Sequence, residues 1–412
     1  MHTRNLRLGL VLSAVVLALA GAQQRPQGAW RAATPEPVAL DGRAPAVRTF
    51  RVVKLSGTPH QRGLQHGTTL REGIRAAVAG WKKNLQATFR MDPDAFIKAF
   101  VASTNYLPAI ERWTPALLDE VRGIAAGSGI DFPTMLTFQL VDEYWVNGDA
   151  AAREHCSGLG IGATAAHGAV IAQNMDLEGF RDGFQTLLHV EDPSGLQAYV
   201  LTMPGLIAMN GMNDRGVGVT ANTLAQLAHN RDGLPVAFVV RGVLERRTFD
   251  EAAAFLRSVR HASGQNYIVG GSGRVAFFEA SSAKVVEVSS NGGFIYHTNH
   301  PLVNDDYSEG GAIEMRQPDV RDNTRTRYAA LQKRLAADPG GDVVGLAKDT
   351  LRSHDSDADP VCRHLKGEQA AFTYASTIMV LSAPDPYLVA APGPPDQQEY
   401  AIFRFGPAAR RK

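Results

Sequence analysis

Two short segments near the middle of the sequence hold residue types that can carry out nucleophilic chemistry. Cys156 lies in the first, His155-Cys156-Ser157-Gly158, and Asp176 ends the second, which is 173–176. Asp176 follows Cys156 by 20 residues, and a hairpin of two strands over that length would bring the end of the second strand back beside the start of the first. The spacing therefore predicts a carboxylate close to a thiol. A cysteine thiol is the most intrinsically nucleophilic of the common catalytic side chains, so covalent chemistry at Cys156 is one interpretation.

Each of the two residues also has a plain structural interpretation. Cys156 could be a buried small apolar residue, or it could form a disulfide with Cys362, the only other cysteine. Asp176 alone could be the hydrogen-bond acceptor of a turn. The residue types by themselves leave these alternatives open.

The sequence predicts neither a metal ion nor another cofactor. Two cysteines are too few for a disulfide-stapled scaffold, and neither CxxC nor HExxH occurs. The segment 354–360 resembles the start of a calcium loop, but Pro360 and Lys366 stand where an EF-hand needs glycine and glutamate. We therefore interpret it as a loop that leads to Cys362.

The elements that must position these residues differ on the two sides of Cys156. Residues 70–144 have the apolar spacing of helices, for example at Ile74, Val78 and Trp81. After Cys156, short apolar runs between glycine and asparagine turns predict strands. The expected strands lie near 168–175, 187–190, 198–203, 207–209, 217–220, 266–269, 275–279, 285–288, 293–298, 377–381, 388–390 and 400–405. Helices are expected among them at 235–245, 249–259, 326–335 and 343–351. Because strands and helices are segregated rather than strictly alternating, we predict an α+β layered architecture.

The first 22 residues have the features of a secretory signal peptide. Arg4 and Arg7 precede an uncharged apolar run, 8–20, and a small-residue cleavage site at 20–22. An uncleaved membrane anchor is the alternative, although the run is short for a membrane span. We expect a periplasmic or secreted protein, a linker over residues 23–48, and no stable membrane span once the signal is removed.

The composition excludes some classes of partner. The 412 residues include 42 Lys and Arg against 41 Asp and Glu, which gives a formal net charge of +1. Without a basic cluster there is no electrostatic footprint for a phosphate backbone, so nucleic acid is not expected as a partner. The length suits either two domains or one large layered domain.

The sequence resembles the penicillin acyltransferase family of self-processing cysteine amidohydrolases, the isopenicillin N acyltransferase group. It resembles the choloylglycine hydrolases more distantly, and all of these are N-terminal nucleophile hydrolases. The motifs that carry the resemblance are 57–67, Cys156 with 173–176, 211–222, His297-Thr298-Asn299-His300-Pro301 and Cys362-Arg363-His364. The resemblance implies a four-layer αββα sandwich with a helical N-terminal segment.

The resemblance also implies that the chain is a precursor, cut before Cys156 by its own thiol. Cys156 would attack the carbonyl of His155, and hydrolysis of the resulting thioester would give two chains, 49–155 and 156–412. The α-amino group so released has a typical pKa of about 7.7–8.0, which suits a general base for its own sulfur. An enzyme that works uncleaved is the competing mechanism.

Site residues follow from the motif positions. By this resemblance Asp176 orients the amine of the nucleophile, and the side-chain amides of Asn222 and Asn299 lie beside it. Arg363 matches an active-site arginine, and Arg327 is a second candidate for that role and for binding substrate. For Arg327 we favour a solvated position on a helix face.

The implied activity is cleavage of a linear amide, with water or an amine as acceptor, on a small-molecule substrate. Met175 stands where the family commonly has an aromatic residue, so it is expected to shape the substrate pocket. The rival hypothesis is an exported, non-catalytic binding protein of the same fold, held by a Cys156–Cys362 disulfide.

Overall fold

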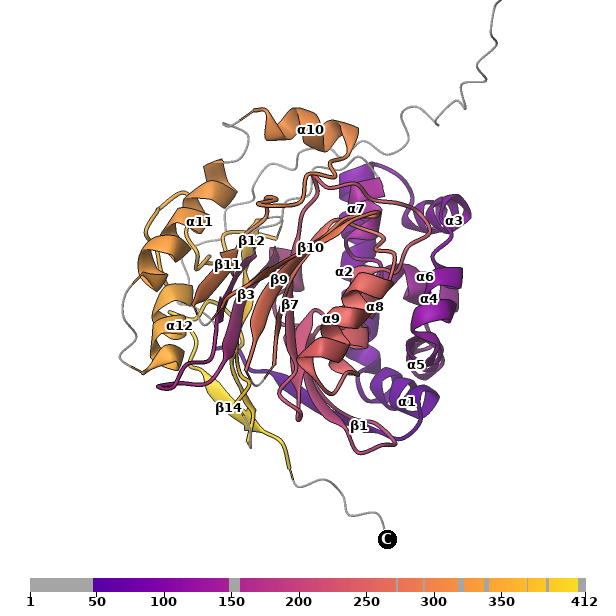
Figure 1. Ribbon diagram of the computed structural model, residues 1–412. Helices are drawn as coiled ribbons and strands as arrows, with labels where there is room; N and C mark the ends of the chain where they lie inside the picture. The colour runs from indigo at the N-terminus through magenta and orange to yellow at the C-terminus, as the bar shows by residue number, and fades with distance from the viewer. Residues whose placement is uncertain are drawn as a thin grey trace, which may run out of the picture.

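Two β-sheets lie face to face between layers of helices (Figure 1). The computed structural model describes residues 47–147, 156–271, 273–291, 293–317, 322–336, 341–368, 370–382 and 385–406. The predicted signal peptide, most of the linker and His155 lie outside these residues. None of the helices in the described ranges has the length and apolar character of a membrane span.

The larger sheet has eight strands, and all neighbouring pairs are antiparallel except the first, which is parallel. Its order is β1 (Arg51–Ser56), β4 (Thr186–Glu191), β5 (Gln197–Thr202), β6 (Asn210–Asn213), β7 (Gly218–Thr223), β8 (Gln265–Gly270), β9 (Val275–Ala280) and β10 (Val285–Ser289).

The smaller sheet has six strands and is antiparallel throughout. Its order is β11 (Phe294–His297), β2 (Ser157–Ile161), β3 (Val170–Glu178), β12 (Ala371–Val380), β13 (Tyr387–Ala391) and β14 (Ala401–Arg404).

Helices cover the outer face of each sheet (Figure 1). On the larger sheet lie α1 (Pro59–Thr69), α2 (Arg71–Phe89), α3 (Pro93–Ser103), α4 (Leu107–Trp113), α5 (Pro115–Ser128), α6 (Phe132–Phe138), α7 (Glu143–Asn147), α8 (Val236–Leu244) and α9 (Phe249–Ser258). On the smaller sheet lie α11 (Asp322–Leu335) and α12 (Val343–Leu351), with α10 (Glu309–Met315) beside them and the short 3₁₀ helix Gly179–Arg181 after β3.

The buried apolar residues of the described ranges form three larger clusters and one small cluster beside α11. In β3, Ile171 belongs to the cluster between the two sheets, whereas Val170 and Ala172 belong to the cluster under α11 and α12. Successive side chains of a strand point to opposite faces, so both faces of this strand are buried. This arrangement confirms the predicted α+β sandwich of four layers.

The first helical segment is joined tightly to the rest of the fold. Helices α1 and α5 cross so closely that a Cβ on Gly63 would overlap the backbone oxygen of Glu120, so only glycine fits there. The Glu120 side chain is fully buried between Arg62 on α1 and Arg241 on α8. Charged groups thus tie the segment before Cys156 to the segment after it.

Two details of the predicted elements are wrong. The strand expected at 207–209 lies at Asn210–Asn213, because the chain first turns at Gly205, which has a positive φ of 89°. The segment before Cys156 is also not purely helical: β1 pairs in parallel with β4 at the edge of the larger sheet. That segment therefore contributes a strand as well as helices to the sandwich.

Candidate active site

Cys156 stands directly before β2, at the end of the hairpin that β2 forms with β3. Ser157 pairs with Asn174, so Cys156, the residue before it, lies opposite Met175. The Cys156 Sγ lies 3.7 Å from the Met175 Sδ and 3.8 Å from the backbone oxygen of Asp176. The predicted hairpin is confirmed, and the end of β3 lies beside the sulfur.

The carboxylate of Asp176 lies on the opposite face of the hairpin from the sulfur. Met175 and Asp176 are successive strand residues, so their side chains point to opposite faces, and the sulfur is on the Met175 side. The Asp176 Oδ1 accepts a hydrogen bond of 2.8 Å from the Thr373 hydroxyl on the neighbouring strand β12. The backbone of Asp176 thus lies beside the thiol, whereas its carboxylate faces Thr373 and Arg363 instead of the sulfur, unlike the sequence-based expectation.

The environment of Asp176 disfavours its charge. Burial raises the pKa of this carboxyl to about 7, although Arg363, Arg327 and the hydrogen bond from Thr373 lower it. A group with a pKa near neutrality can change its charge within the working pH range of an enzyme, as acid and base groups of active sites commonly do.

Arg327 is not on a solvated helix face, as the sequence suggested, but fully buried against the start of β2. Its Nη1 donates to the backbone oxygen of Cys156 at 2.7 Å and to the Ser157 hydroxyl at 3.0 Å. Its Nη2 donates to the Asn299 Oδ1 at 3.0 Å, and its Nε to the Asn323 side chain one turn earlier on α11. Helix α11 is polar overall, so its sequence gave no sign that one of its arginines is buried.

The cationic state of Arg327 survives this burial. Burial, and then the neighbouring Arg363, lower the pKa of its guanidinium to about 10. The group is therefore charged at neutral pH. Its four hydrogen bonds join the start of β2 to Asn323 and to the loop that carries Asn299.

Arg363 approaches Asp176 from the segment before β12. Its Nε lies 3.5 Å from the Asp176 Oδ2, and its Nη2 lies 3.7 Å from the Asp359 Oδ1. Within the described part of the chain, the Asp176 Oδ2 and these two nitrogens of Arg363 have no hydrogen-bond partner. Both arginines therefore lie close to the Cys156–Asp176 hairpin, but Arg327 holds the backbone at Cys156 whereas Arg363 faces the Asp176 carboxylate.

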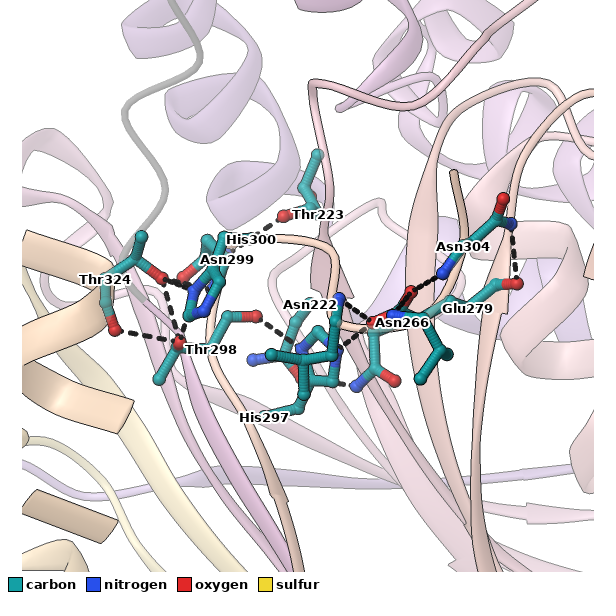
Figure 2. Close-up of polar contacts among 12 residues, drawn as sticks. Asn222, Thr223, Asn266, Glu279, His297, Thr298, Asn299, His300, Asn304 and Thr324 are labelled. Atoms are coloured by element: carbon teal, nitrogen blue, oxygen red, sulfur yellow. Dashed lines mark hydrogen bonds and ion pairs between the residues drawn. The ribbon is translucent and has the colours of Figure 1, made fainter. Parts of the chain in front are cut away.

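The two asparagines occupy different positions in the space between the sheets (Figure 2). The Asn299 Nδ2 donates to the backbone oxygen of Thr223 at 3.1 Å. The Asn222 Oδ1 accepts a weak, 3.4 Å hydrogen bond from Asn266, and its buried Nδ2 has no partner among the described residues. A Cβ on Gly158 would lie 3.1 Å from the Asn222 Oδ1, so Asn222 packs against β2 two residues from Cys156.

A buried contact between His297 and Glu279, which the sequence did not predict, shapes the loop that carries Asn299 (Figure 2). The His297 Nε2 lies 2.7 Å from the Glu279 Oε1. The Glu279 carboxylate also accepts three backbone N–H groups, from Leu302 at 2.6 Å, Val303 at 3.0 Å and Asn304 at 2.6 Å. Burial raises the pKa of Glu279, but the contact with His297 and the backbone hydrogen bonds from Leu302 and Asn304 outweigh it, so the pKa is lowered. The sequence does hold one sign of this contact, because Glu279 stands within the apolar run of β9.

Thr324 completes the support of this loop from α11. Its hydroxyl accepts the backbone N–H of Asn299 at 2.8 Å and also contacts the Thr298 hydroxyl (Figure 2). Arg327 lies one turn further along the same helix. Helix α11 thus holds both the backbone and the side chain of Asn299.

The two cysteines are both buried thiols and form no disulfide. The Cys362 Sγ lies 3.1 Å from the Asp396 Oδ1, whereas the sulfur of Cys156 contacts Met175. The disulfide on which the non-catalytic alternative depended is therefore not formed.

Residues 164–356 match the family described as acyl-coenzyme A:6-aminopenicillanic acid acyl-transferase. This match covers a little under half of the chain, and it shows a similarity to that family. It begins after Cys156 and includes Asp176, Asn222, Asn299 and Arg327, whereas Arg363 lies beyond its end.

Several solved structures are similar to this chain at low sequence identity. A variant of the conjugated bile acid hydrolase from Clostridium perfringens is 14% identical, with 61% of this chain and 97% of that chain covered and a TM-score of 0.37. Penicillin V acylase from Agrobacterium tumefaciens is 13% identical, with coverages of 61% and 85% and a TM-score of 0.38. No curated protein matches the sequence.

Proposed function

We propose that the protein is an amidohydrolase or acyltransferase that forms an acyl-enzyme on Cys156. The observation that carries this proposal is the buried guanidinium of Arg327, which contacts the Cys156 backbone, the Ser157 hydroxyl and the Asn299 amide together. Such a contact fixes a nucleophile relative to a neighbouring amide, and fixed geometry is a large part of catalysis. The match of residues 164–356 to an acyl-transferase family supports the same reaction class.

The chemical step needs a base near the sulfur. In a chain that begins at Cys156, its α-amino group would take the thiol proton as the sulfur attacks the amide carbonyl, forming a C–S bond and an oxyanion. Collapse of this intermediate breaks the C–N bond, and the ammonium returns the proton to the leaving amine. Water then hydrolyses the thioester in a hydrolase, or an acceptor amine takes the acyl group in a transferase.

Asn222 is the better candidate of the two asparagines for the oxyanion. Its Nδ2 is buried and available, whereas the Asn299 amide is engaged with Thr223 and Arg327. Removing one oxyanion donor typically costs about 2.7–4 kcal/mol of transition-state stabilisation. Asn299 is then a positioning residue, which links Arg327 to the strand that carries Asn222.

The same thiol would produce its own α-amino group. Attack of the Cys156 sulfur on the carbonyl of His155 breaks the peptide C–N bond in an N-to-S acyl shift, and water then hydrolyses the thioester. The two pieces would stay together, because β1 is paired with β4 and Glu120 is held by Arg241 across the cut.

The substrate proposed here is a small-molecule amide with an acyl group that contacts Met175, whose sulfur lies against Cys156. The predicted signal peptide supports export to the periplasm or the medium. Acyl-coenzyme A donors belong to the cytoplasm, so export favours water as the acceptor.

The decisive experiment is intact-mass analysis and N-terminal sequencing of the wild-type protein and of Cys156→Ala and Cys156→Ser. We expect the wild type to break between His155 and Cys156, the alanine variant to stay whole, and the serine variant to be cut slowly. Incubating the alanine variant with wild-type protein controls for cleavage by a second molecule. An alanine variant cut at the same bond would refute self-processing.

A screen of linear amides with the processed wild type tests the activity itself. Quenching during turnover should trap an acyl mass on the peptide that begins with Cys156. If the wild type stays uncut but still forms this adduct, the acyl-enzyme proposal stands and the self-processing proposal is refuted. Absence of both cut and adduct across the screen would overturn the proposed function.

A further inference from the structure

A second cluster of reactive side chains lies outside the proposed nucleophile site. It consists of His354, Cys362, His364 and Asp396, whose ligand atoms all lie within 4.8 Å of one another. They come from three segments: the loop after α12, the segment before β12, and the turn before β14. Only the folded chain brings them together, which is why the sequence predicted no metal ion.

The Asp396 carboxylate is the centre of this cluster. Its Oδ1 lies 3.1 Å from the Cys362 Sγ, and its Oδ2 lies 2.6 Å from the His364 Nε2 and 3.0 Å from the His354 Nε2. The two imidazole rings are 4.8 Å apart between centroids. All four donor groups therefore converge on one point.

The burial of the four residues is graded from the inside to the surface. Cys362 is fully buried, whereas the side chains of His354 and His364 are 37% and 40% exposed and that of Asp396 is 26% exposed. An ion from solvent could reach the cluster from the histidine side, with the sulfur as its innermost ligand.

We propose that His354, Cys362, His364 and Asp396 form a binding site for one zinc ion. One thiolate, two imidazoles and one carboxylate are ligand types that zinc accepts in tetrahedral geometry, whereas calcium and magnesium prefer oxygen ligands only. Four protein ligands complete a tetrahedral zinc site, which is the arrangement of structural sites.

The distances suit an ion of this size after a small adjustment. Zinc bonds of about 2.0–2.3 Å place tetrahedral ligand atoms roughly 3.3–3.8 Å apart. The observed separations span this range, from 2.6 Å between Asp396 and His364 to no more than 4.8 Å for any pair. Slight opening of the Asp396 contacts and closing of the others would admit the ion.

The acidic residues beside His354 do not contribute a calcium site. Asp355 is paired with Arg334, and Asp359 lies 3.7 Å from Arg363. The segment that resembled a calcium loop therefore contributes a histidine to a zinc site instead.

The zinc site would also fix a residue of the proposed active site. Its ligands Cys362 and His364 flank Arg363, whose Nε lies 3.5 Å from Asp176. A bound ion would anchor this segment to the turn at Asp396 and so hold Arg363 beside the carboxylate. This consequence rests on the proposed function, whereas zinc binding itself does not.

Zinc binding is tested on the full-length protein without a histidine tag. We expect elemental analysis to find about one zinc per chain, and a protein stripped with a chelator to rebind Zn²⁺ at about one per chain. Zn²⁺ should lower the rate of alkylation of Cys362 at least about tenfold, because a bound thiolate is shielded. Peptide mapping measures this rate. Co²⁺ should give a thiolate-to-cobalt absorption band.

Variants assign these signals to the four ligands. Cys362→Ser should abolish the cobalt band, and His364→Gln and Asp396→Asn should each weaken Zn²⁺ binding at least about tenfold. His60→Gln is the matched control: His60 also faces a carboxylate, Asp119 at 3.6 Å, but without further ligands, so its loss should leave the zinc content unchanged.

The native protein alone can overturn the proposal, even if a variant fails to fold. A wild-type chain that binds no Zn²⁺ on titration, and in which Cys362 alkylates equally fast with and without Zn²⁺, would show that the cluster is only a hydrogen-bond network. These readouts do not involve catalysis. A failure of the amide screen would therefore leave the zinc result standing, and a failure of zinc binding would leave the acyl-enzyme proposal standing.

Discussion

Two buried carboxylates in this fold have opposite surroundings. Glu120, in the helical layer, accepts four hydrogen bonds of 2.8–3.1 Å from Arg62 and Arg241. Asp176, on β3 in the hairpin of β2 and β3, accepts one hydrogen bond from Thr373 and has Arg363 at 3.5 Å. Each carboxylate faces two arginines, and both are almost completely buried.

The two pKa shifts differ in sign. Burial raises both, but the charges and hydrogen bonds of Arg241 and Arg62 outweigh it at Glu120, whose pKa is lowered. At Asp176 burial wins, and the pKa rises to about 7. The number of nearby arginines therefore does not decide the charge of a buried carboxyl; the closeness of their charges and their direct hydrogen bonds do. The Glu120 carboxylate is saturated with hydrogen bonds, whereas that of Asp176 is left partly unpaired.

The largest effect on stability is expected from removing the charge of Glu120, whose carboxylate accepts four hydrogen bonds. Glu120→Gln would leave Arg62 and Arg241 buried without a counter-charge, and such a loss typically costs about 3–5 kcal/mol of unfolding free energy. Urea unfolding measures it, and Glu111→Gln on the exposed face of α4 is the control. A loss under about 1 kcal/mol for Glu120→Gln would mean that the cluster does not hold the layers together.

Loss of the Asn222 side-chain amide, whose Nδ2 has no partner among the described residues, should affect turnover rather than stability. For Asn222→Ala we expect kcat to fall about 10²–10³-fold, because the oxyanion loses a donor, while the unfolding free energy changes little. Asn213→Ala is the matched comparison, because the Nδ2 of Asn213 is already satisfied by the backbone oxygens of Leu244 and Arg246. It should lose stability and keep kcat in the surviving folded protein; the reverse pattern would contradict our assignment of Asn222.

The sequence predicted the parts of the site that depend on local structure. Cys156 and Asp176 belong to one hairpin, and the turn spacing and alternation of that hairpin can be read along the chain. The face to which each side chain points was not predicted, because it depends on a register that one residue would reverse. Arg327 was misjudged because a polar helix is buried only through its contacts with β2 and the loop at Asn299.

The same reasoning explains why the remaining polar clusters were missed. The residues around Glu120 come from α1, α5 and α8, and as sequence they look like surface charges. The four proposed zinc ligands likewise come from three segments. Neither spacing nor composition carries information on such contacts, which tertiary packing alone creates.

The raised pKa of Asp176, unlike the lowered pKa of Glu120, predicts that part of the stability of the protein is lost as pH rises. The folded-state pKa of Asp176, about 7, exceeds its ordinary value of 3.8, so between these values the unfolded chain has released a proton that the folded chain keeps. Stability from this group therefore falls as pH rises from about 4 to 7. Asp176→Asn should gain roughly 4 kcal/mol at pH 8 relative to the wild type and almost nothing at pH 4, measured by urea unfolding. An equal effect at both pH values would contradict the raised pKa.

The smallest effect is expected from removing the one hydrogen bond that the Asp176 carboxylate accepts. Thr373→Val removes its one hydrogen bond, which lowers the pKa of the carboxyl, so the pKa should rise further, by less than about one unit. If catalysis needs the ionised carboxylate, the acid limb of kcat/KM against pH moves upward by the same amount, while the rate at high pH is nearly retained. Thr377→Val, on the same strand but bonded to Asn210, is the control and should leave the limb in place. A uniform loss of rate at every pH would instead assign Thr373 to positioning, and Asp176 would then act without a change of charge.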